Sequence, residues 1–233
     1  MIISTFKSLK KVLLYIKQFG LLRTISFIRS DIHMRSNKTF SDSDWINIKC
    51  RDQDSKERIV AIIGSGRFAF STIAYFLNNY NKKFLRCVFS PGKSSAVSLC
   101  KYYKGLYVPS DWRDILNDEK VKLVYIASPP ETHAEYAIAC IKAGKNVYIE
   151  KPPVVSESQL KLLKESMIKH PKVKVFLGFN RSSAETFVEL SNFISRESGF
   201  MKANCYMSVN KSLVTRDMSD IDYAILDHLC HFT

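Results

Sequence analysis

The fold of this chain is indicated by residues 58–77, which read RIVAIIGSGRFAFSTIAYFL. Residues 58–63 form a short apolar run rich in β-branched side chains, which is typical of a buried strand, and a helical pattern follows over residues 68–77. Between the two patterns stands a G-x-G-x-x-A turn, whose members are Gly64, Ser65, Gly66, Arg67, Phe68 and Ala69. The motif therefore lies where a strand ends and a helix begins.

Each small residue of this turn has a physical purpose. Gly64 permits the tight turn, Gly66 allows the backbone to approach a pyrophosphate, and Ala69 lets the helix pack closely against the strand. The first N–H groups of a helix have no partner within the helix and attract an anion. We therefore predict a dinucleotide site with residues 64–68 as cofactor contacts; the alternative is a tight turn with a structural role alone.

Downstream of the turn, apolar strands alternate with amphipathic helices. Strands that alternate with helices at this spacing form βαβ units, which build a mostly parallel, doubly wound sheet. The sequence thus predicts an α/β Rossmann domain over residues 58–180. We expect further strands over residues 84–89, 123–127, 147–150 and 173–178, and helices over 68–77, 94–103, 111–116, 132–143 and 157–169.

The second expected strand ends without the acidic residue that commonly binds the adenine ribose in NAD sites. The segment at its end reads Phe89-Ser90-Pro91-Gly92-Lys93. Hydroxyl and ammonium groups suit a ribose 2′-phosphate, so Ser90 and Lys93 are candidate cofactor contacts, and NADP is slightly favoured over NAD. The alternative is that Lys93 is a solvated residue at the start of a helix.

Two further loops are expected at the carboxyl edge of the sheet, where ligands of open α/β folds bind. The third strand leads into a loop with Ser128 and Pro129 and then into a helix that begins near His133, and the fourth strand ends in Glu150 and Lys151. These residues are candidate contacts of the reacting end of the cofactor. His133 is equally well explained as a structural residue of its helix.

The stretch at residues 121–153 resembles the middle of the glucose-fructose oxidoreductase and inositol dehydrogenase (Gfo/Idh/MocA) family; it reads VKLVYIASPPETHAEYAIACIKAGKNVYIEKPP and ends in the family's E-K-P mark. The resemblance extends from about residue 58 to residue 233. VFLGFNR at residues 175–181 is similar to the strand that leads into the family's second domain, and LDHLCHF at residues 226–232 is similar to its D-x-G-x-H helix. It implies an NAD(P)-dependent oxidoreductase that acts on a sugar, sugar nucleotide or polyol.

The family's catalytic trio falls on Lys151, Asp227 and His231 of this chain. Oxidation of an alcohol carbon requires removal of the hydroxyl proton, for which His231 is a suitable base because its ordinary pKa is near neutrality. Asp227 lies four residues earlier, on the same helix face, and orients the imidazole. Lys151 hydrogen-bonds the substrate oxygen. The resemblance also implies that Glu150 positions this lysine and that the bond between Lys151 and Pro152 is cis.

A metal site is the alternative for the last helix, which also holds His228 and Cys230 beside Asp227 and His231. A zinc site usually needs about four ligands, and no nearby residue completes such a set, so no metal is expected.

The chain departs from the family near its end. Ile221-Asp222-Tyr223 stands where relatives tend to have glycines, and Leu229 replaces a small residue, which implies an altered substrate space. The family continues into a second domain that commonly forms the subunit interface. The resemblance therefore allows a homo-oligomer without requiring one. We expect residues 181–233 to be only the start of that domain. One interpretation is a shortened copy of a dehydrogenase; the alternative is a catalytically impaired nucleotide-binding protein that acts as a partner module.

The N-terminal segment differs in composition from the rest. The chain has 233 residues and a formal net charge of +13, and residues 1–40 alone hold eight basic residues against one acid, Asp31. Apolar residues at helical spacing predict two amphipathic helices between residues 6 and 29, separated by Gly20, and a polar linker over residues 30–57. We interpret residues 1–57 as a helical arm that packs on the main domain or on a partner subunit; contact with an anionic membrane face is the alternative.

Composition excludes several classes of protein. Apolar residues make up 46% of the chain and charged residues 24%, which argues against a disordered chain. No apolar run approaches the roughly 18 residues of a transmembrane helix. Six scattered cysteines without a CxxC pair fit a reducing cytosol, so a cytoplasmic protein is expected. The positive charge is the only feature that favours nucleic acid, and no recognised motif supports such a partner.

Overall fold

The computed structural model describes residues 12–35 and 58–179, together with positions 185, 188, 189, 192 and 196. Five parallel strands form one sheet in the order β2-β1-β3-β4-β5. This arrangement confirms the predicted doubly wound sheet. The strands are β1 (Val60–Ile63), β2 (Leu85–Phe89), β3 (Leu123–Ile126), β4 (Asn146–Ile149) and β5 (Val175–Leu177).

Helices connect the strands in the predicted alternation. The helix after β1 differs from the prediction in one respect, because its first part is a π-helix, a form that often marks functional sites. The helices of the domain are η2 (the π-helix, Ala69–Ile73), α4 (Ala74–Tyr80), α5 (Lys93–Tyr102), α6 (Arg113–Asn117), α7 (Pro130–Lys142) and α8 (Glu157–Lys169).

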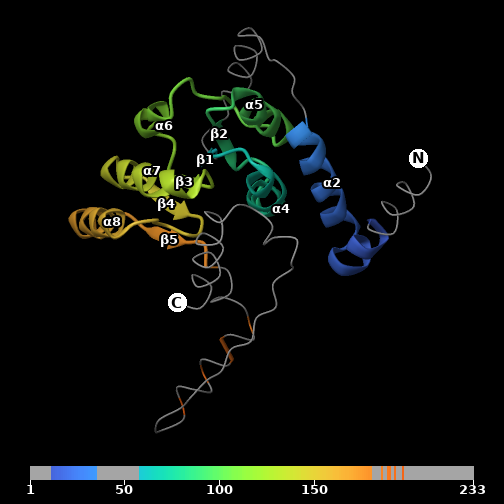
Figure 1. Cartoon of the computed structure of the whole chain (residues 1–233). Helices are drawn as coiled ribbons and strands as arrows, with labels where there is room; N and C mark the ends of the chain where they lie inside the picture. Colours follow the sequence, from blue (N-terminus) through green and yellow to red (C-terminus); the bar gives the residue numbers. More distant parts are fainter. Residues whose placement is uncertain are drawn as a thin grey trace.

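The two faces of the sheet carry separate hydrophobic cores. Because side chains alternate along a strand, Val60 and Ile62 of β1 point to one core, while Ala61 and Ile63 point to the other. The first core is closed by η2, α4 and α5, and the second by α6, α7 and α8, so that the molecule has three layers (Figure 1). Burial on both faces explains the near-continuous apolar strands of the sequence.

The order of the strands creates a crevice beside the G-x-G-x-x-A turn. β1 pairs with β2 on one side and with β3 on the other. Beyond β2, a single parallel bridge joins Cys87 to Tyr107. The chain therefore proceeds outward from β1 to Tyr107 and then crosses back to β3. Ligands of such folds bind where the direction reverses, at the carboxyl ends of β1 and β3.

The N-terminal arm is helical, as predicted, but it extends further than expected. One helix covers residues 12–19, Gly20 adopts φ +79°, and helix α2 (Leu21–Arg35) follows. The prediction that a linker begins at residue 30 is wrong for residues 30–35. The helix continues there because Ser30 and His33 are buried against the Rossmann domain.

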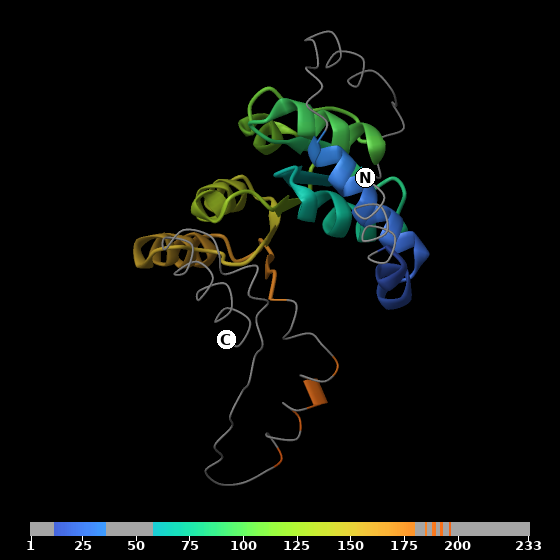
Figure 2. The ribbon, with the colours of Figure 1, turned by 45° about the vertical axis from the view of Figure 1, so that its right-hand side comes forward.

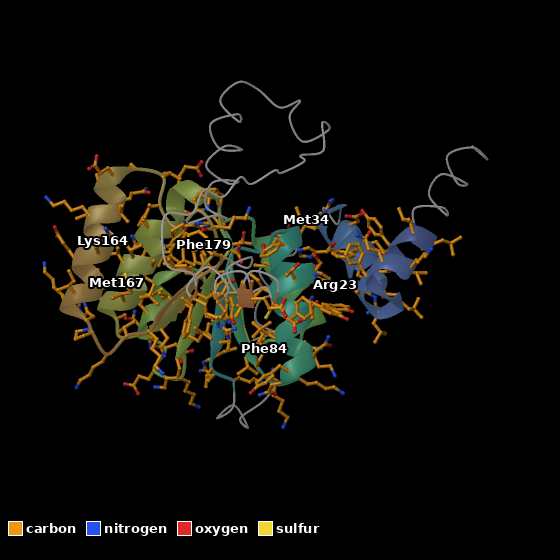
Figure 3. All side chains as sticks on the ribbon, turned by 90° about the horizontal axis from the view of Figure 1, so that it is seen from below. Arg23, Met34, Phe84, Lys164, Met167 and Phe179 are labelled. Atoms are coloured by element: carbon orange, nitrogen blue, oxygen red, sulfur yellow. The ribbon has the colours of Figure 1, made fainter. Side chains whose placement is uncertain are left out.

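Helix α2 lies across η2 and α5 at one side of the molecule (Figure 2), while α8 lies at the opposite side, as the labels on Arg23 and Lys164 show (Figure 3). Its polar residues Ser26, Ser30 and His33 face the domain. Its apolar residues face outward: Leu22 is 72% exposed and Ile32 is 62% exposed. The arm thus packs on the domain through the face opposite to the apolar one, because η2 and α5 present polar groups to it.

Three of the six cysteines lie in the described part of the chain, and all three are buried and free: Cys87, Cys100 and Cys140. Burial raises the pKa of Cys87 and that of Cys140 to about 12, so these thiols act as small apolar side chains. Residues 36–57 of the expected linker and the candidates Asp227 and His231 lie outside the described residues.

Candidate dinucleotide site

Gly64 forms the close contact that shapes the crevice. Its N–H donates to the carbonyl of Phe89 at 2.8 Å, and Ala127 N–H donates to the carbonyl of Ile63 at 2.8 Å, so the turn is held between the ends of β2 and β3. At φ +104°, a Cβ atom at Gly64 would lie 2.3 Å from the carbonyl oxygen of Ala127. Only glycine fits this position.

Gly66 differs from Gly64 because its surroundings are open. A Cβ atom at Gly66 would meet no atom within 4 Å, and the Gly66 carbonyl accepts the first helical hydrogen bond, from Phe70 N at 3.0 Å. The missing side chain therefore leaves room above a helix N-terminus. This open space, the cradle, lies at a helix N-terminus and has room for an anion such as a pyrophosphate, so residues 64–68 fit a dinucleotide.

Serine side chains brace the turn from the neighbouring loop. The Oγ atoms of Ser65 and Ser95 lie 2.5 Å apart, and Ser95 Oγ donates to the carbonyl of Gly92 at 2.8 Å. Ser90 is half-buried at the end of β2, where no acid stands, and Lys93 is exposed as the first residue of α5. The structure therefore brings the predicted contacts Ser90 and Lys93 to the loop beside the turn.

His133 connects the two loops of the reacting end. Its ring is 2% exposed, with Nε2 2.8 Å from the carbonyl oxygen of Ser128 and Nδ1 2.8 Å from that of Pro152. Both nitrogens face backbone carbonyl oxygens, and the ring N–H donates to one of them, which favours the structural role considered for this residue. The bond between Lys151 and Pro152 is cis, as the family resemblance implied. Residue spacing alone does not reveal this bridge, since Pro152 lies 19 residues away.

Glu150 is buried at the end of β4, and its neighbours form a hollow. A Cβ atom at Gly178 would lie 3.1 Å from Glu150 Oε2, so the glycine leaves space for the carboxyl group. Burial and the adjacent Glu150 raise the pKa of Tyr148. A pocket of about 360 Å³ brings two predicted site residues together, Phe68 and Glu150; it is also lined by Thr72, Ile73, Phe76, Leu77, Tyr125 and Tyr148.

The sequence gives no hint that the arm reaches the turn. Asp31 forms an ion pair with Arg67 at 2.9 Å, and His33 Nε2 lies 2.8 Å from the carbonyl oxygen of Ser65. Both partners of the arm belong to residues 64–68 of the predicted site. No local pattern connects these segments, because they are more than 30 residues apart.

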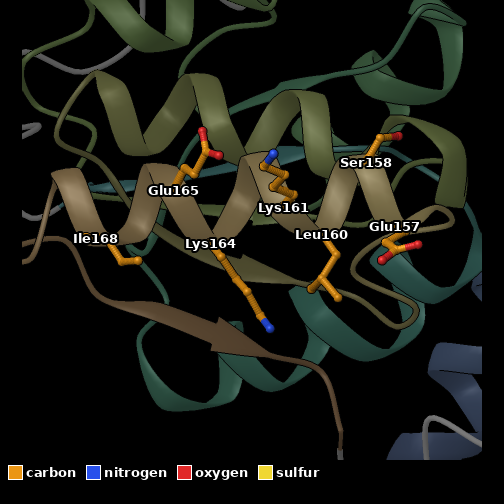
Figure 4. A pocket seen from close by; sticks show the side chains of 7 residues that line it. All are labelled: Glu157, Ser158, Leu160, Lys161, Lys164, Glu165 and Ile168. Carbon is orange, nitrogen blue, oxygen red and sulfur yellow. The ribbon is translucent and has the colours of Figure 1, made fainter.

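A second hollow, of about 510 Å³, lies against α8 and includes Lys161 and Lys164 (Figure 4). The described residues that line it all come from this one helix, and none is a predicted site residue. Within the described residues, no group of three metal-ligating side chains occurs. The crevice at the phosphate turn is therefore the candidate site.

Comparison with known proteins agrees with this geometry. Residues 58–179 match the GFO_IDH_MocA family, described as "Oxidoreductase family, NAD-binding Rossmann fold". The chain belongs to the Gfo/Idh/MocA family. The match covers the domain that carries the turn, both loops and the cis bond, and it confirms the resemblance predicted from the E-K-P stretch.

Two relatives illustrate the extent of the Gfo/Idh/MocA match. The inositol 2-dehydrogenase of Salmonella typhimurium is 33% identical over 108 residues, which are 46% of this chain and 32% of that protein. An NAD-binding oxidoreductase from Klebsiella pneumoniae superposes with a TM-score of 0.51 at 27% identity, over 60% of this chain and 39% of that one. The chain thus spans about a third of the length of the curated relative.

A second solved structure was determined with ligands bound. The scyllo-inositol dehydrogenase of Lactobacillus casei, solved with NAD(H) and scyllo-inositol, superposes with a TM-score of 0.53 at 21% identity, over 60% of this chain and 41% of that one. At this identity the likeness concerns the fold.

Among the described residues, no helix has both the length and the apolar content needed to cross a membrane.

Proposed function

We propose that this chain provides the dinucleotide-binding part of an NAD(P)-dependent oxidoreductase, which transfers a hydride between a nicotinamide cofactor and a hydroxyl or carbonyl group of a sugar, sugar nucleotide or polyol. The observation that carries the proposal is the open cradle at Gly66, next to a pocket that Phe68 of the same turn and Glu150 line together. Membership of the Gfo/Idh/MocA family and the inositol 2-dehydrogenase relative support the substrate class.

In this proposal, residues 64–68 hold the pyrophosphate through the turn and the helix N-terminus. Ser90 and Lys93 contact the adenosine end, which slightly favours NADP over NAD, while Ser128 and Pro129 line the opposite loop. The bound nicotinamide supplies the hydride acceptor or donor. The buried bridge from His133 to Pro152 holds the backbone next to Lys151 in place.

The same proposal assigns the proton chemistry to three side chains. The Lys151 ammonium donates to the substrate oxygen and stabilises a developing alkoxide, an effect worth a few kcal/mol, about 3, in comparable sites. His231 takes the hydroxyl proton, and Asp227 orients its imidazole. Glu150 positions Lys151 from its buried place at the end of β4.

Calorimetric titration with NAD and NADP tests the cofactor site. The wild-type chain should bind one or both, and Gly66→Trp should abolish binding because an indole fills the open cradle. Turnover is then measured as substrate-dependent absorbance of the reduced nicotinamide, with Lys151→Ala and His231→Ala as inactive controls. Cofactor binding without turnover on any polyol or sugar would favour the alternative, a nucleotide-binding partner module. Absence of binding in the wild type would overturn both.

A second candidate activity is peripheral contact of the arm with an anionic membrane. The outward face of α2 carries Leu21, Leu22 and Ile32, each more than half exposed, while the only acid of residues 12–35 is engaged by Arg67. An apolar stripe with basic neighbours and no free acid fits an anionic lipid surface. We propose a cytoplasmic location for the protein, with this contact at the membrane surface. Formation of a homo-oligomer is a separate proposal that this contact does not affect.

Point variants test the membrane contact better than removal of residues 1–40, because that deletion would also uncover the phosphate turn. Leu22→Glu with Ile32→Glu should abolish co-sedimentation with phosphatidylserine vesicles. Ile168→Glu on α8 is the matched control, since Ile168 is 78% exposed on the other side of the molecule. Equal sedimentation of all variants, or sedimentation of none including the wild type, would overturn this candidate.

A further inference from the structure

The inward face of α2 is built to bind backbone groups of the Rossmann domain. Arg23 donates to the carbonyl of Ser71 and to Thr72 Oγ1, and Ser26 Oγ donates to the same Ser71 carbonyl at 3.4 Å. Both acceptors belong to the π-helix η2, which starts in the phosphate turn. The first half of α2 thus anchors the arm on the helix that points at the cofactor cradle.

The last turn of α2 contacts the phosphate turn itself. His33 is 4% exposed and its ring stacks on Phe70, with ring centroids 4.5 Å apart. A carbonyl oxygen only accepts, so Nε2 donates to the Ser65 carbonyl at 2.8 Å, and Nδ1 accepts from Ser98 Oγ at 2.8 Å in the neutral ring. Both polar atoms of the imidazole are satisfied, and the ring is fixed from three sides.

This contact fixes the direction of one peptide group in the turn. In a planar trans peptide, the carbonyl and the following N–H point in opposite directions. With the Ser65 carbonyl held toward His33, the Gly66 N–H is turned away from α2, toward the other side of the turn. A glycine-rich turn otherwise has many conformations, and its ordering on binding costs affinity.

We propose that α2 is part of the dinucleotide site and that His33 is a positioning residue that preorganises the phosphate turn for its diphosphate ligand. The inference rests on the proposed function for the identity of that ligand. It assigns the N-terminal arm a role at the cofactor that neither the turn motif nor the family match implies.

The test compares variants that separate ring packing, hydrogen bonding and docking of the arm. His33→Phe keeps an aromatic ring beside Phe70 but removes both hydrogen bonds. His33→Gln restores a donor for the Ser65 carbonyl. Arg23→Met is the matched control, because it removes the anchor at Ser71 and Thr72 and leaves the turn untouched. Circular dichroism and the melting temperature report whether each variant folds.

Two readouts follow the turn directly: amide hydrogen exchange of residues 64–68 without ligand, and the Kd for ADP, which carries the diphosphate. His33→Phe should exchange faster in this segment and bind ADP about tenfold more weakly, the size expected for one hydrogen bond. His33→Gln should recover most of the slow amide exchange and most of the ADP affinity. Arg23→Met should stay within about twofold of the wild type in exchange rate and in Kd. Ser98→Ala, which frees one edge of the ring, should show a smaller change in the same direction and serves if His33→Phe does not fold.

Unchanged exchange and affinity in both His33→Phe and Ser98→Ala would overturn the inference. An equal loss in Arg23→Met would overturn it as well, because docking of the arm alone would then explain the effect. A wild-type chain that does not bind ADP would overturn the proposed function instead. In that case the amide hydrogen exchange of residues 64–68 without ligand, compared between His33→Phe and Arg23→Met, still decides whether His33 orders the turn.

Discussion

The carboxylate of Asp31 lies 2.9 Å from the guanidinium of Arg67 and thereby joins the N-terminal arm to the phosphate turn. The side chains are 49% and 63% exposed, respectively, and an ion pair as exposed as this adds little to stability. Its consequence is electrostatic: it sets how much positive charge the turn presents to a phosphorylated ligand.

Asp31→Asn should raise the affinity for NADP relative to NAD by about threefold, because Arg67 loses its counter-ion and the 2′-phosphate adds negative charge nearby. Titration of both cofactors measures the ratio. Asp111→Asn is a matched control, since the pair of Asp111 with Arg113 has the same side-chain exposures and lies in a different loop. An unchanged ratio in Asp31→Asn would show that Arg67 does not sense the 2′-phosphate.

The two glycines of the turn should separate stability from binding. Gly64→Ala should lower the melting temperature, because its Cβ would collide with the Ala127 carbonyl and its φ of +104° disfavours a side chain, at a combined cost of about 1–3 kcal/mol or more. Gly66→Ala should melt like the wild type, yet bind ADP at least about tenfold more weakly, since the added methyl group enters the cradle. Equal melting temperatures of the two variants would contradict this assignment.

His133→Leu should destabilise the domain by about 1–3 kcal/mol, because the variant removes the ring N–H that donates to the carbonyl oxygen of Ser128 or of Pro152 and leaves that oxygen without its partner. Denaturant unfolding measures the difference. His170→Ala provides the comparison: its ring is only half-buried and contacts the carbonyl of Ser166 within the same helix end, so its loss should cost less than about 1 kcal/mol. An unchanged free energy of unfolding in His133→Leu would contradict the bridging role of His133.

Docking of α2 should weaken in mild acid. Burial lowers the pKa of His33 from its ordinary value of 6.5, although the Ser65 carbonyl acts in the opposite direction. The unfolded chain therefore takes up this proton first, so stability is full above about pH 6.5 and is lost as the pH falls toward the lower folded value. Ser65, Ser98 and Phe70 contact the ring.

Denaturant unfolding of the wild type and of His33→Gln between pH 8 and pH 5 measures this effect. The wild type should lose more stability over the range than the variant, because the variant lacks the imidazole of residue 33 and keeps the same other histidines. Parallel curves for the two proteins would exclude His33 as the source of the pH dependence.

Local patterns in the sequence determined most of the domain. The strand, turn and helix at residues 58–77 follow from β-branched residues, glycine spacing and helical periodicity, and α8 covers the predicted residues 157–169. These features depend on interactions between residues a few positions apart, which the sequence displays directly. The cis bond before Pro152 was accessible only through the family resemblance, since no spacing rule predicts it.

Only the tertiary structure decided the order of the strands, the bridge at His133 and the orientation of α2. Periodicity predicted amphipathic helices in this arm but did not say which face would be buried. In the structure His33 and Ser30 are buried, while Leu22 and Ile32 face outward. The physical reason is that the groups which α2 meets, among them the carbonyls of Ser65 and Ser71, are polar and belong to distant segments. Which face of a helix is buried depends on the surface it meets, and that surface forms only when the chain folds.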